Sequence, residues 1–283
     1  MKVGCHVSIA KSIDLSFTRA EKIGCTTFQI FTKNPRGWFV KPLENEAIVK
    51  FKYKMVRSDI SPIFAHISYL PNLASSDRIV YKKSIESLLL ELERCMILTI
   101  PYFIIHGGSY KGGSFKQGFD IYVNSILKGL EAVKNKVTIL VENSAGGKNS
   151  LTGDISNIAK ILEEIGDEKS VKFCFDTCHG FVAGYDLRNK QAIDYTLSII
   201  ESNIGLDNLI LIHANDSKGD FMSNRDIHEH IGLGRIGEEG FKELVNHPLL
   251  KNKFWILETP VNKIRSDKEN INFLLSLVSN KKE

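Results

Sequence analysis

The sequence predicts an α/β protein, specifically a (β/α)8 TIM barrel of parallel strands with its active site at the carboxyl ends of the strands. Eight short runs rich in β-branched and aromatic residues recur along the 283 residues, and stretches with the apolar spacing of helices separate them. The runs are almost continuously apolar, which indicates strands buried on both faces, as in a parallel sheet. Eight such units in a chain of this length match the barrel. A doubly wound sheet is the alternative architecture.

The strand signals follow one another along the whole chain, and most runs end in polar residues. They are KVGCHVS (2–8), CTTFQIFT (25–32), SPIFAHIS (61–68), YFIIHGG (102–108), TILVENS (138–144), KFCFDTCH (172–179), NLILIHAND (208–216) and FWILETP (254–260). Helical spacing of apolar residues is clearest in the segments 84–98, 119–133, 154–166 and 238–250. No low-complexity linker or break in composition interrupts the alternation. We therefore expect a single domain over residues 1–283 with a short polar tail, NKKE, at its end.

The composition excludes several classes of protein. Hydrophobic residues make up 43% of the chain and charged residues 25%, as in soluble globular proteins, and no apolar run approaches the length of a membrane span. The chain opens without a secretory signal and its five cysteines are scattered, so we expect reduced thiols and a cytoplasmic location. A net charge of +4 is compatible with a polyanionic partner without requiring one.

Ionisable residues gather at the ends of the expected strands, which form the face that carries the active site in such barrels. A single histidine at the end of a strand is most often structural, and a single glutamate in a turn is usually just solvated. Repetition at seven strand ends changes this interpretation, because several carboxylates brought together are unfavourable unless cations neutralise them. The pattern therefore predicts a multinuclear metal site. Its candidate residues are His6, His66, His106, Glu142, Asp176, His179, His213 and Glu258.

The segment HANDSKGDFMSNRDIHEHIGLGRIG (213–237) adds further candidates. Asp226 and His228 lie two residues apart and can aim two side chains at one ion from an extended loop, with His230 as an alternative ligand to His228. The glycines at positions 232, 234 and 237 suit a loop that bends tightly against a site. Imidazole and carboxylate donors favour zinc, with manganese or iron as alternatives, and the chain has no CxxC pair to form a thiolate zinc site.

The stretch FCFDTCHGFVAGYD (173–186) combines two cysteines with two candidate ligands. Cys174 and Cys178 are four residues apart on the expected strand, so both should project to the face that Asp176 also occupies, with a loop beginning before His179. Their spacing is not that of a CxxC redox pair. We expect Asp176 and His179 to be the ligands and the cysteines to pack.

Taken together, several motifs resemble the endonuclease IV family of abasic-site DNA repair enzymes. The resemblance runs from residue 1 to about residue 277. The motifs are AHISYLPNLAS (65–75), FIIHGGS (103–109), VENSAG (141–146), CFDTCHGFVAGYD (174–186), the segment 213–237 quoted above and ILETP (256–260).

The resemblance implies the barrel fold, three zinc ions and a ligand set. It implies that His66 and His106 hold one ion, which Glu142 bridges to a second ion. Asp176, His213 and Glu258 would complete the second site. His179, Asp226 and His228 would hold the third ion, and Glu142 and Glu258 would be the catalytic residues.

The implied reaction is hydrolysis of the phosphodiester 5′ to an abasic site in double-stranded DNA. The products would be a 3′-hydroxyl and a 5′-deoxyribose phosphate, with trimming of blocked 3′ ends as a side activity. The stretches FTKNPRGW (31–38) and ISYLPN (67–72) resemble the family's loops that wedge into the minor groove, which makes Arg36, Tyr69 and Leu70 the expected DNA contacts. We expect the chain to act as a monomer.

Two other functions fit parts of the pattern. A sugar isomerase or epimerase of the xylose isomerase-like barrels would share the carboxylate-rich core, but it has little use for the additional histidines and the aromatic and basic rim loops. A non-catalytic DNA-binding barrel would bind abasic duplex without metal and without nicking it.

Overall fold

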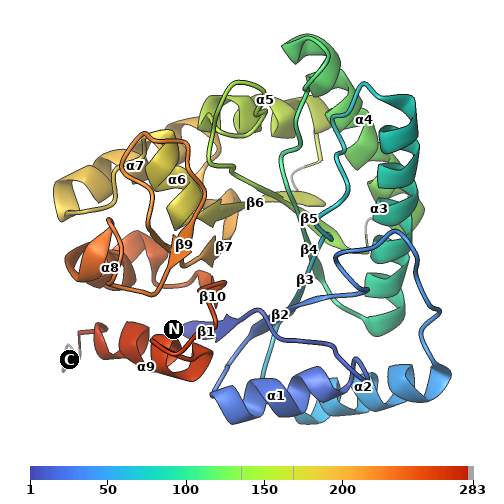
Figure 1. Ribbon diagram of the computed structural model, residues 1–283, viewed down its shortest axis with the longest axis horizontal. Helices are drawn as coiled ribbons and strands as arrows, with labels where there is room; N and C mark the ends of the chain where they lie inside the picture. Colours follow the sequence, from blue (N-terminus) through green and yellow to red (C-terminus); the bar gives the residue numbers. More distant parts are fainter. Residues whose placement is uncertain (135, 168, 280–283) are drawn as a thin grey trace.

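Eight parallel strands form one sheet that curls into a barrel, and the larger helices surround it (Figure 1). The computed structural model describes residues 1–134, 136–167 and 169–279. The expected tail, NKKE, lies outside the described residues. The predicted (β/α)8 architecture is confirmed, and the open doubly wound alternative is wrong. The strands are β1 (Lys2–Cys5), β2 (Phe28–Phe31), β3 (Ile63–His66), β4 (Tyr102–Ile105), β5 (Thr138–Glu142), β6 (Val171–Asp176), β7 (Leu209–His213) and β10 (Phe254–Leu257).

The order of the strands shows how the barrel closes. The ladder runs β1-β10-β7-β6-β5-β4-β3-β2, so the first strand of the chain pairs with the last. Between β1 and β2 the only bridge found in the described chain joins His6 to Gln29, and the amide of Val7 donates to the carbonyl of Gln29 at 2.7 Å. The barrel therefore has one weak seam, at which β1 and β2 meet.

The helices pack on the outside of the barrel, and capping side chains mark where several of them begin. Asp77 accepts hydrogen bonds from the amides of Ile79 and Val80, and Ser266 forms a capping box with Glu269. The helices are α1 (Leu15–Ile23), α2 (Asn45–Arg57), α3 (Arg78–Leu98), α4 (Phe115–Val133), α5 (Ile155–Ile165), α6 (Thr177–Ala183), α7 (Lys190–Asn203), α8 (Gly237–Asn246) and α9 (Asp267–Ser276). Within the described residues, none of these helices is long and apolar enough to cross a membrane.

The structure differs from the sequence prediction after two strands. The strand predicted over 172–179 ends at Asp176, because its side chain accepts a hydrogen bond from the amide of His179 and so caps helix α6. Cys178 is therefore helical and does not continue the strand face of Cys174. After β7, two short strands that were not predicted, β8 (Asp216–Ser217) and β9 (His228–Glu229), pair antiparallel.

The interior of the barrel is filled by a compact apolar layer, separate from the larger core between the sheet and the helices. This inner layer sets the position of the site, because side chains two residues apart on a strand point to the same face. Its fully buried members are Phe64, Ile104, Leu140, Cys174, Leu211 and Ile256. In each case the residue two positions further along is a predicted ligand: His66, His106, Glu142, Asp176, His213 and Glu258.

Candidate metal centre

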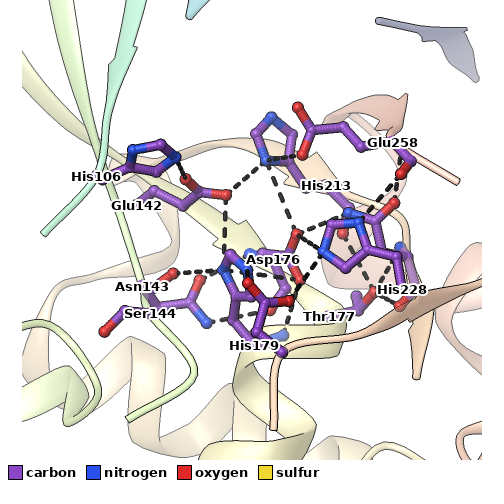
Figure 2. Close-up of polar contacts among 12 residues, drawn as sticks. His106, Glu142, Asn143, Ser144, Asp176, Thr177, His179, His213, His228 and Glu258 are labelled. Carbon is purple, nitrogen blue, oxygen red and sulfur yellow. Dashed lines mark hydrogen bonds and ion pairs between the residues drawn. The ribbon is translucent and has the colours of Figure 1, made fainter. Parts of the chain in front are cut away.

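The predicted ligands converge at the carboxyl end of the barrel, above the inner apolar layer. Figure 2 shows Glu142 and Asp176 with the imidazoles of His179, His213 and His228 turned toward them. The site opens into a cavity of about 720 Å³. Among the described residues, three sets made only of histidine and carboxylate ligands have their ligand atoms within 4.8 Å of one another, a spacing that one cation per set could share, and a fourth set joins Cys178 to Asp176 and His228. The first three sets are His66, Glu142 and His213; Glu142, Asp176, His213 and Glu258; and His179, Asp226 and His228.

Glu142 is the centre of the cluster. One of its carboxylate oxygens lies 2.7 Å from Nδ1 of His213 and 3.7 Å from Nδ1 of His179. The other lies 3.4 Å from Nε2 of His66 and 3.9 Å from Nε2 of His106. The side chain is buried at the end of β5, so its charge acts on four imidazoles at once.

Three histidines present the same ring nitrogen to the cluster because the backbone holds the other one. Nδ1 of His66 donates to the carbonyl of Ile67 at 2.8 Å, and Nδ1 of His179 donates to the carbonyl of Asn143 at 2.9 Å. Nδ1 of His228 donates to the carbonyl of Glu258 at 3.1 Å. In the neutral form of each ring, Nε2 therefore carries the lone pair, and this nitrogen faces the carboxylates. This is the arrangement by which proteins orient histidine ligands.

Gln29 of β2 orients the ring of His213 through its side-chain amide, as backbone carbonyls orient the other three histidines. Its Oε1 accepts a hydrogen bond from Nε2 of His213 at 2.8 Å, and its Nε2 donates to Glu258 at 2.6 Å. The carboxylate can only accept, which fixes the orientation of the amide. His213 consequently turns Nδ1 toward Glu142, Asp176 and Glu258.

Asp176 is held by two asparagines, one from β7's loop and one from β5's. The side-chain amide of Asn215 donates to the Asp176 carboxylate at 2.7 Å, and its carbonyl oxygen accepts from the amide of Glu258 at 2.8 Å. Asn143 bonds both the amide and the carbonyl of Asp176. The ends of four strands, β5, β6, β7 and β10, are thereby joined around the carboxylates.

The third set combines helix α6 with the β8 to β9 loop. Nε2 of His179 lies 3.2 Å from Asp226, and Nε2 of His228 lies 3.4 Å from the other oxygen of Asp226. Nε2 of His228 is buried and forms no well-aligned hydrogen bond, although carboxylate oxygens of Asp226 and Asp176 lie within 4 Å of it. A buried nitrogen of this kind is costly to leave unpaired. It is therefore an observation that favours a cation between these side chains.

The pKa shifts in the cluster indicate that its carboxylates stabilise positive charge beside them. Burial alone would raise the pKa of Glu142, but His213 and His66 hold the pKa of that carboxyl well below its usual range. Burial also lowers the pKa of His228, yet Asp226 and Asp176 outweigh it and raise this pKa to about 9. His106 differs from these histidines. Burial lowers its pKa most and the neighbouring His66 lowers it further, to about 4.

His106 occupies the rim of the cluster. Its side chain is 38% exposed, its ring centroid lies 4.7 Å from that of His66, and its closest carboxylate is Glu142. Because it lies at the edge of the cavity, it falls outside the three compact sets. The structure thus brings all nine predicted ligands to one basin and places eight of them in compact sets.

Two histidines and two cysteines that the sequence singled out have other surroundings. His6 contacts Gln29 and lies 3.7 Å from Glu258, at the seam of the barrel. His230 is buried between Asn262 and Asn270, away from the cluster, so His228 is the one that faces it. Cys174 belongs to the inner apolar layer. Cys178 is also buried, but its sulfur lies within 4.8 Å of ligand atoms of Asp176 and His228.

The loop that follows His228 and strand β9 is shaped by Asp216, a residue that sequence reasoning missed. Its buried carboxylate accepts hydrogen bonds from the amides of Gly232, Gly234 and Ile236 at 2.9–3.0 Å. A Cβ atom at Gly234 would lie 2.4 Å from the carboxylate, so only glycine fits there. The glycines of this loop therefore bend around Asp216 and not directly against the metal ligands.

The proposed DNA-contacting residues lie beside the cavity on two adjoining loops. Tyr69 is 59% exposed and Leu70 is 38% exposed, and both line the cavity. Arg36 is exposed on the neighbouring loop. The amide of Tyr69 donates to the carbonyl of Pro35 at 3.2 Å, and the Tyr69 ring packs edge-on against Phe31. The two loops thus form one rim.

Comparison with known proteins agrees with this geometry. Residues 17–277 match the family model of the xylose isomerase-like TIM barrel. The chain is 46% identical over 270 residues to the probable endonuclease 4 of Methanoculleus marisnigri, with 95% of this chain and 96% of that protein covered. It is 43% identical over 276 residues to the probable endonuclease 4 of Nitrosopumilus maritimus, with 96% and 98% covered.

Solved structures separate the family from the wider fold. Endonuclease IV from Thermus thermophilus superposes with a TM-score of 0.87 at 30% identity, over 98% of each chain. A D-tagatose 3-epimerase-like protein superposes with a TM-score of 0.73 at 19% identity, over 98% of this chain and 97% of that one, and so shares the fold alone. The chain therefore belongs to the endonuclease IV family, the abasic-site nucleases of DNA repair that its motifs resemble.

Proposed function

We propose that this protein is a metal-dependent endonuclease that hydrolyses the phosphodiester 5′ to an abasic site in double-stranded DNA. The products are a 3′-hydroxyl and a 5′-deoxyribose phosphate, and the same site trims blocked 3′ ends. The observation that carries this proposal is a shared orientation of four imidazoles: in each, the outer nitrogen bonds an acceptor while the inner nitrogen faces carboxylates. These residues are His66, His179, His213 and His228. Membership of the endonuclease IV family supports the choice of substrate.

The residues present fit three cations. His66 and His106 with Glu142 would hold the first, and His179, Asp226 and His228 the third. Glu142, Asp176, His213 and Glu258 would hold the second. Nε2 of His228, which is buried between two carboxylates without a well-aligned hydrogen bond, is the clearest sign of fit. The donors are imidazole and carboxylate, which favours zinc, with manganese or iron as an alternative in one site. When bound, such ions supply positive charge to the phosphate and acidify the attacking water.

The protein's own residues hold and expose this site. Glu142 is shared between two of the proposed cation positions, and Glu258 closes the second from the last strand, so we assign both a catalytic role. Gln29 and Asn215 keep the carboxylates and His213 in place. Arg36, Tyr69 and Leu70 would enter the minor groove at the lesion, where the missing base makes unstacking least costly.

The direct test is a duplex with one abasic site and a labelled 5′ end, incubated with the metal-loaded protein. We expect a single nick 5′ to the lesion, and extension of the product by a DNA polymerase would identify its 3′-hydroxyl. Pentoses and hexoses are incubated in parallel. Epimerisation of a sugar without nicking would favour the isomerase, and tight binding without nicking would favour a non-catalytic barrel.

Removing the two rim side chains should reduce lesion specificity. The double change Arg36→Ala and Tyr69→Ala removes the insertion that offsets bending and unstacking, so affinity for the abasic duplex should fall about tenfold or more. Undamaged DNA is held mainly through phosphates and should lose much less. Titration of both duplexes at one salt concentration measures this, with metal content unchanged.

The chain offers a matched control for the loss of one arginine and one tyrosine. Arg57 stacks on the exposed ring of Tyr53 on helix α2, with 4.5 Å between the guanidinium carbon and the ring centroid. Changing both to alanine alters the net charge by the same amount and should leave lesion specificity intact. Equal losses on both duplexes for the rim variant would make Arg36 and Tyr69 ordinary backbone contacts.

Gln29→Met should weaken metal binding without removing a ligand. Methionine keeps an unbranched side chain of similar length but cannot orient His213 or bond Glu258, and loss of such a supporting group typically costs about 10–100-fold in metal affinity. Competition with a chelator of known affinity measures the effect. The exposed Gln191→Met on α7 serves as the control. Unchanged metal affinity in Gln29→Met would show that His213 is oriented without the amide.

A further inference from the structure

A buried charged residue on helix α3 lies behind the two rim loops. Glu91 is fully buried, and one of its oxygens, Oε1, receives every hydrogen bond that the carboxylate makes. Lys33, itself 3% exposed, places its Nζ 3.8 Å from the same oxygen. One carboxylate oxygen is therefore the meeting point of several chain segments.

The first connection runs to the loop of Arg36. Nζ of Lys33 donates to the carbonyl of Gly37 at 3.1 Å, and Gly37 directly follows Arg36. Arg94, one turn after Glu91 on the same helix, donates to the carbonyls of Thr32 and Lys41. Arg94 of helix α3 thus holds this loop at both ends, and Lys33, which is paired with Glu91 of the same helix, holds it near its tip.

The second connection runs to the loop of Tyr69. The hydroxyl of Ser68 donates to Oε1 of Glu91 at 2.9 Å, and its backbone amide points to the same oxygen at 3.5 Å. Ser68 directly precedes Tyr69 in the chain. The two loops also touch each other, because the amide of Tyr69 donates to the carbonyl of Pro35. Glu91 is therefore the shared anchor of both proposed wedge residues.

A contribution to the stability of the fold does not by itself explain the buried pair of Glu91 and Lys33. Burial raises the pKa of Glu91 and lowers that of Lys33, so the fold opposes the charge on both partners. The second oxygen of Glu91 is buried without a hydrogen-bond partner. Buried ion pairs often contribute little net stability, and their better-supported use is to specify one arrangement of the groups that they join.

We propose that Glu91 is a positioning residue that couples the two rim loops, so that Arg36 and Tyr69 enter the DNA as one preorganised wedge. This inference rests on the proposed function, because it assumes that the rim residues open the duplex at the lesion. Glu91 is fully buried, and its hydrogen bonds and ion pair among the described residues run to Ser68, Ser87 and Lys33, so it would act without contacting DNA or a proposed metal ligand. Its effect is on lesion specificity, through the position of the loops.

Two serines that bond the same oxygen allow a matched test. Ser68 and Ser87 each donate a hydroxyl hydrogen bond to Oε1 of Glu91 at 2.9 Å, but Ser87 belongs to α3 and joins no loop. Each change to alanine removes one such bond to the carboxylate, so both should lower thermal stability similarly. Only Ser68→Ala should lower the ratio of abasic to undamaged duplex affinity, by about fivefold for the loss of one such bond.

Metal content is measured in every variant, because Ser68 lies close to His66 in the chain. Equal specificity ratios for Ser68→Ala and Ser87→Ala would overturn the coupling. A loss of specificity that follows a loss of metal in Ser68→Ala would overturn it as well. Lys33→Met tests the other connection without a change near a metal ligand, and it too should lower the specificity ratio.

A double-mutant cycle distinguishes this inference from the proposed wedge. If Glu91 acts through Tyr69, then Ser68→Ala should have no further effect on specificity in a Tyr69→Ala background. Full additivity of the two changes would overturn the coupling. If Tyr69→Ala alone leaves specificity unchanged, the wedge assignment fails. If Tyr69→Ala lowers specificity but Ser68→Ala and Lys33→Met do not, the wedge remains and only the coupling fails.

Discussion

Stripping the protein of all bound metal should abolish cleavage of abasic DNA, and adding zinc back should restore it. Against the effect of burial, His213 and His66 lower the pKa of Glu142, and Asp226 and Asp176 raise that of His228 to about 9, so the charges of these described residues are already paired with one another. Bound cations are therefore the proposed source of positive charge at the phosphate. Elemental analysis of the purified protein should find about three zinc-like ions per chain. Cleavage is then followed on a labelled abasic duplex before chelation, after chelation and after zinc is returned.

A metal-free preparation that nicks the duplex at the full rate would refute the proposed mechanism. Exchange of one ion for manganese or iron would not, since the same donors accept those metals. Binding of abasic duplex by the stripped protein is informative in its own right. Strong binding combined with no nicking in both the stripped and the zinc-loaded protein would mean a DNA-binding barrel without catalysis.

Glu142→Gln should be nearly inactive while it keeps much of its affinity for DNA. Glutamine has the same size as glutamate but lacks the charge that faces His66, His106, His179 and His213. Two proposed cation positions share this carboxylate, so turnover should fall by roughly two orders of magnitude or more. Single-turnover cleavage and duplex titration measure the two quantities separately.

The control for this variant is Glu163→Gln, a change of the same kind on an exposed position of helix α5. It should match the wild-type protein in turnover, metal content and binding. Turnover within a few-fold of wild type in Glu142→Gln would contradict the bridging role. An equal loss of DNA affinity and turnover would instead indicate a collapsed site, which the melting temperature and metal content would reveal.

The ligand positions could be predicted because they follow from the period of a strand. His66, Glu142 and His213 each follow a buried apolar residue by two positions. The alternation that places apolar side chains inside the barrel therefore also turns these predicted ligands toward its interior. The same reasoning failed after Asp176. The strand pattern could not show that this carboxylate caps a helix, and it therefore left Cys178 on the wrong element.

The supporting amides were missed because no spacing rule marks them. Asn215 and Asn143 are ordinary polar residues in loops until the strand ends are brought together. Gln29 could have been recognised from the sequence, because it is a polar residue between the apolar residues Phe28 and Ile30 of a predicted strand. A glutamine that faces a barrel interior must find hydrogen-bond partners there, which points to the polar end of the barrel.

The place of β10 in the sheet has a consequence for the synthesis of the protein. Because β10 lies between β7 and β1, strand β1 gains its main partner only when residues 254–257 have emerged from the ribosome. Until then β1 and β7 keep open edges. Glu258 is the next residue of the chain, so the sheet and its carboxylate cluster are completed together. A chain that ends before β10 has neither, so under the proposed function we expect such a fragment not to cleave DNA.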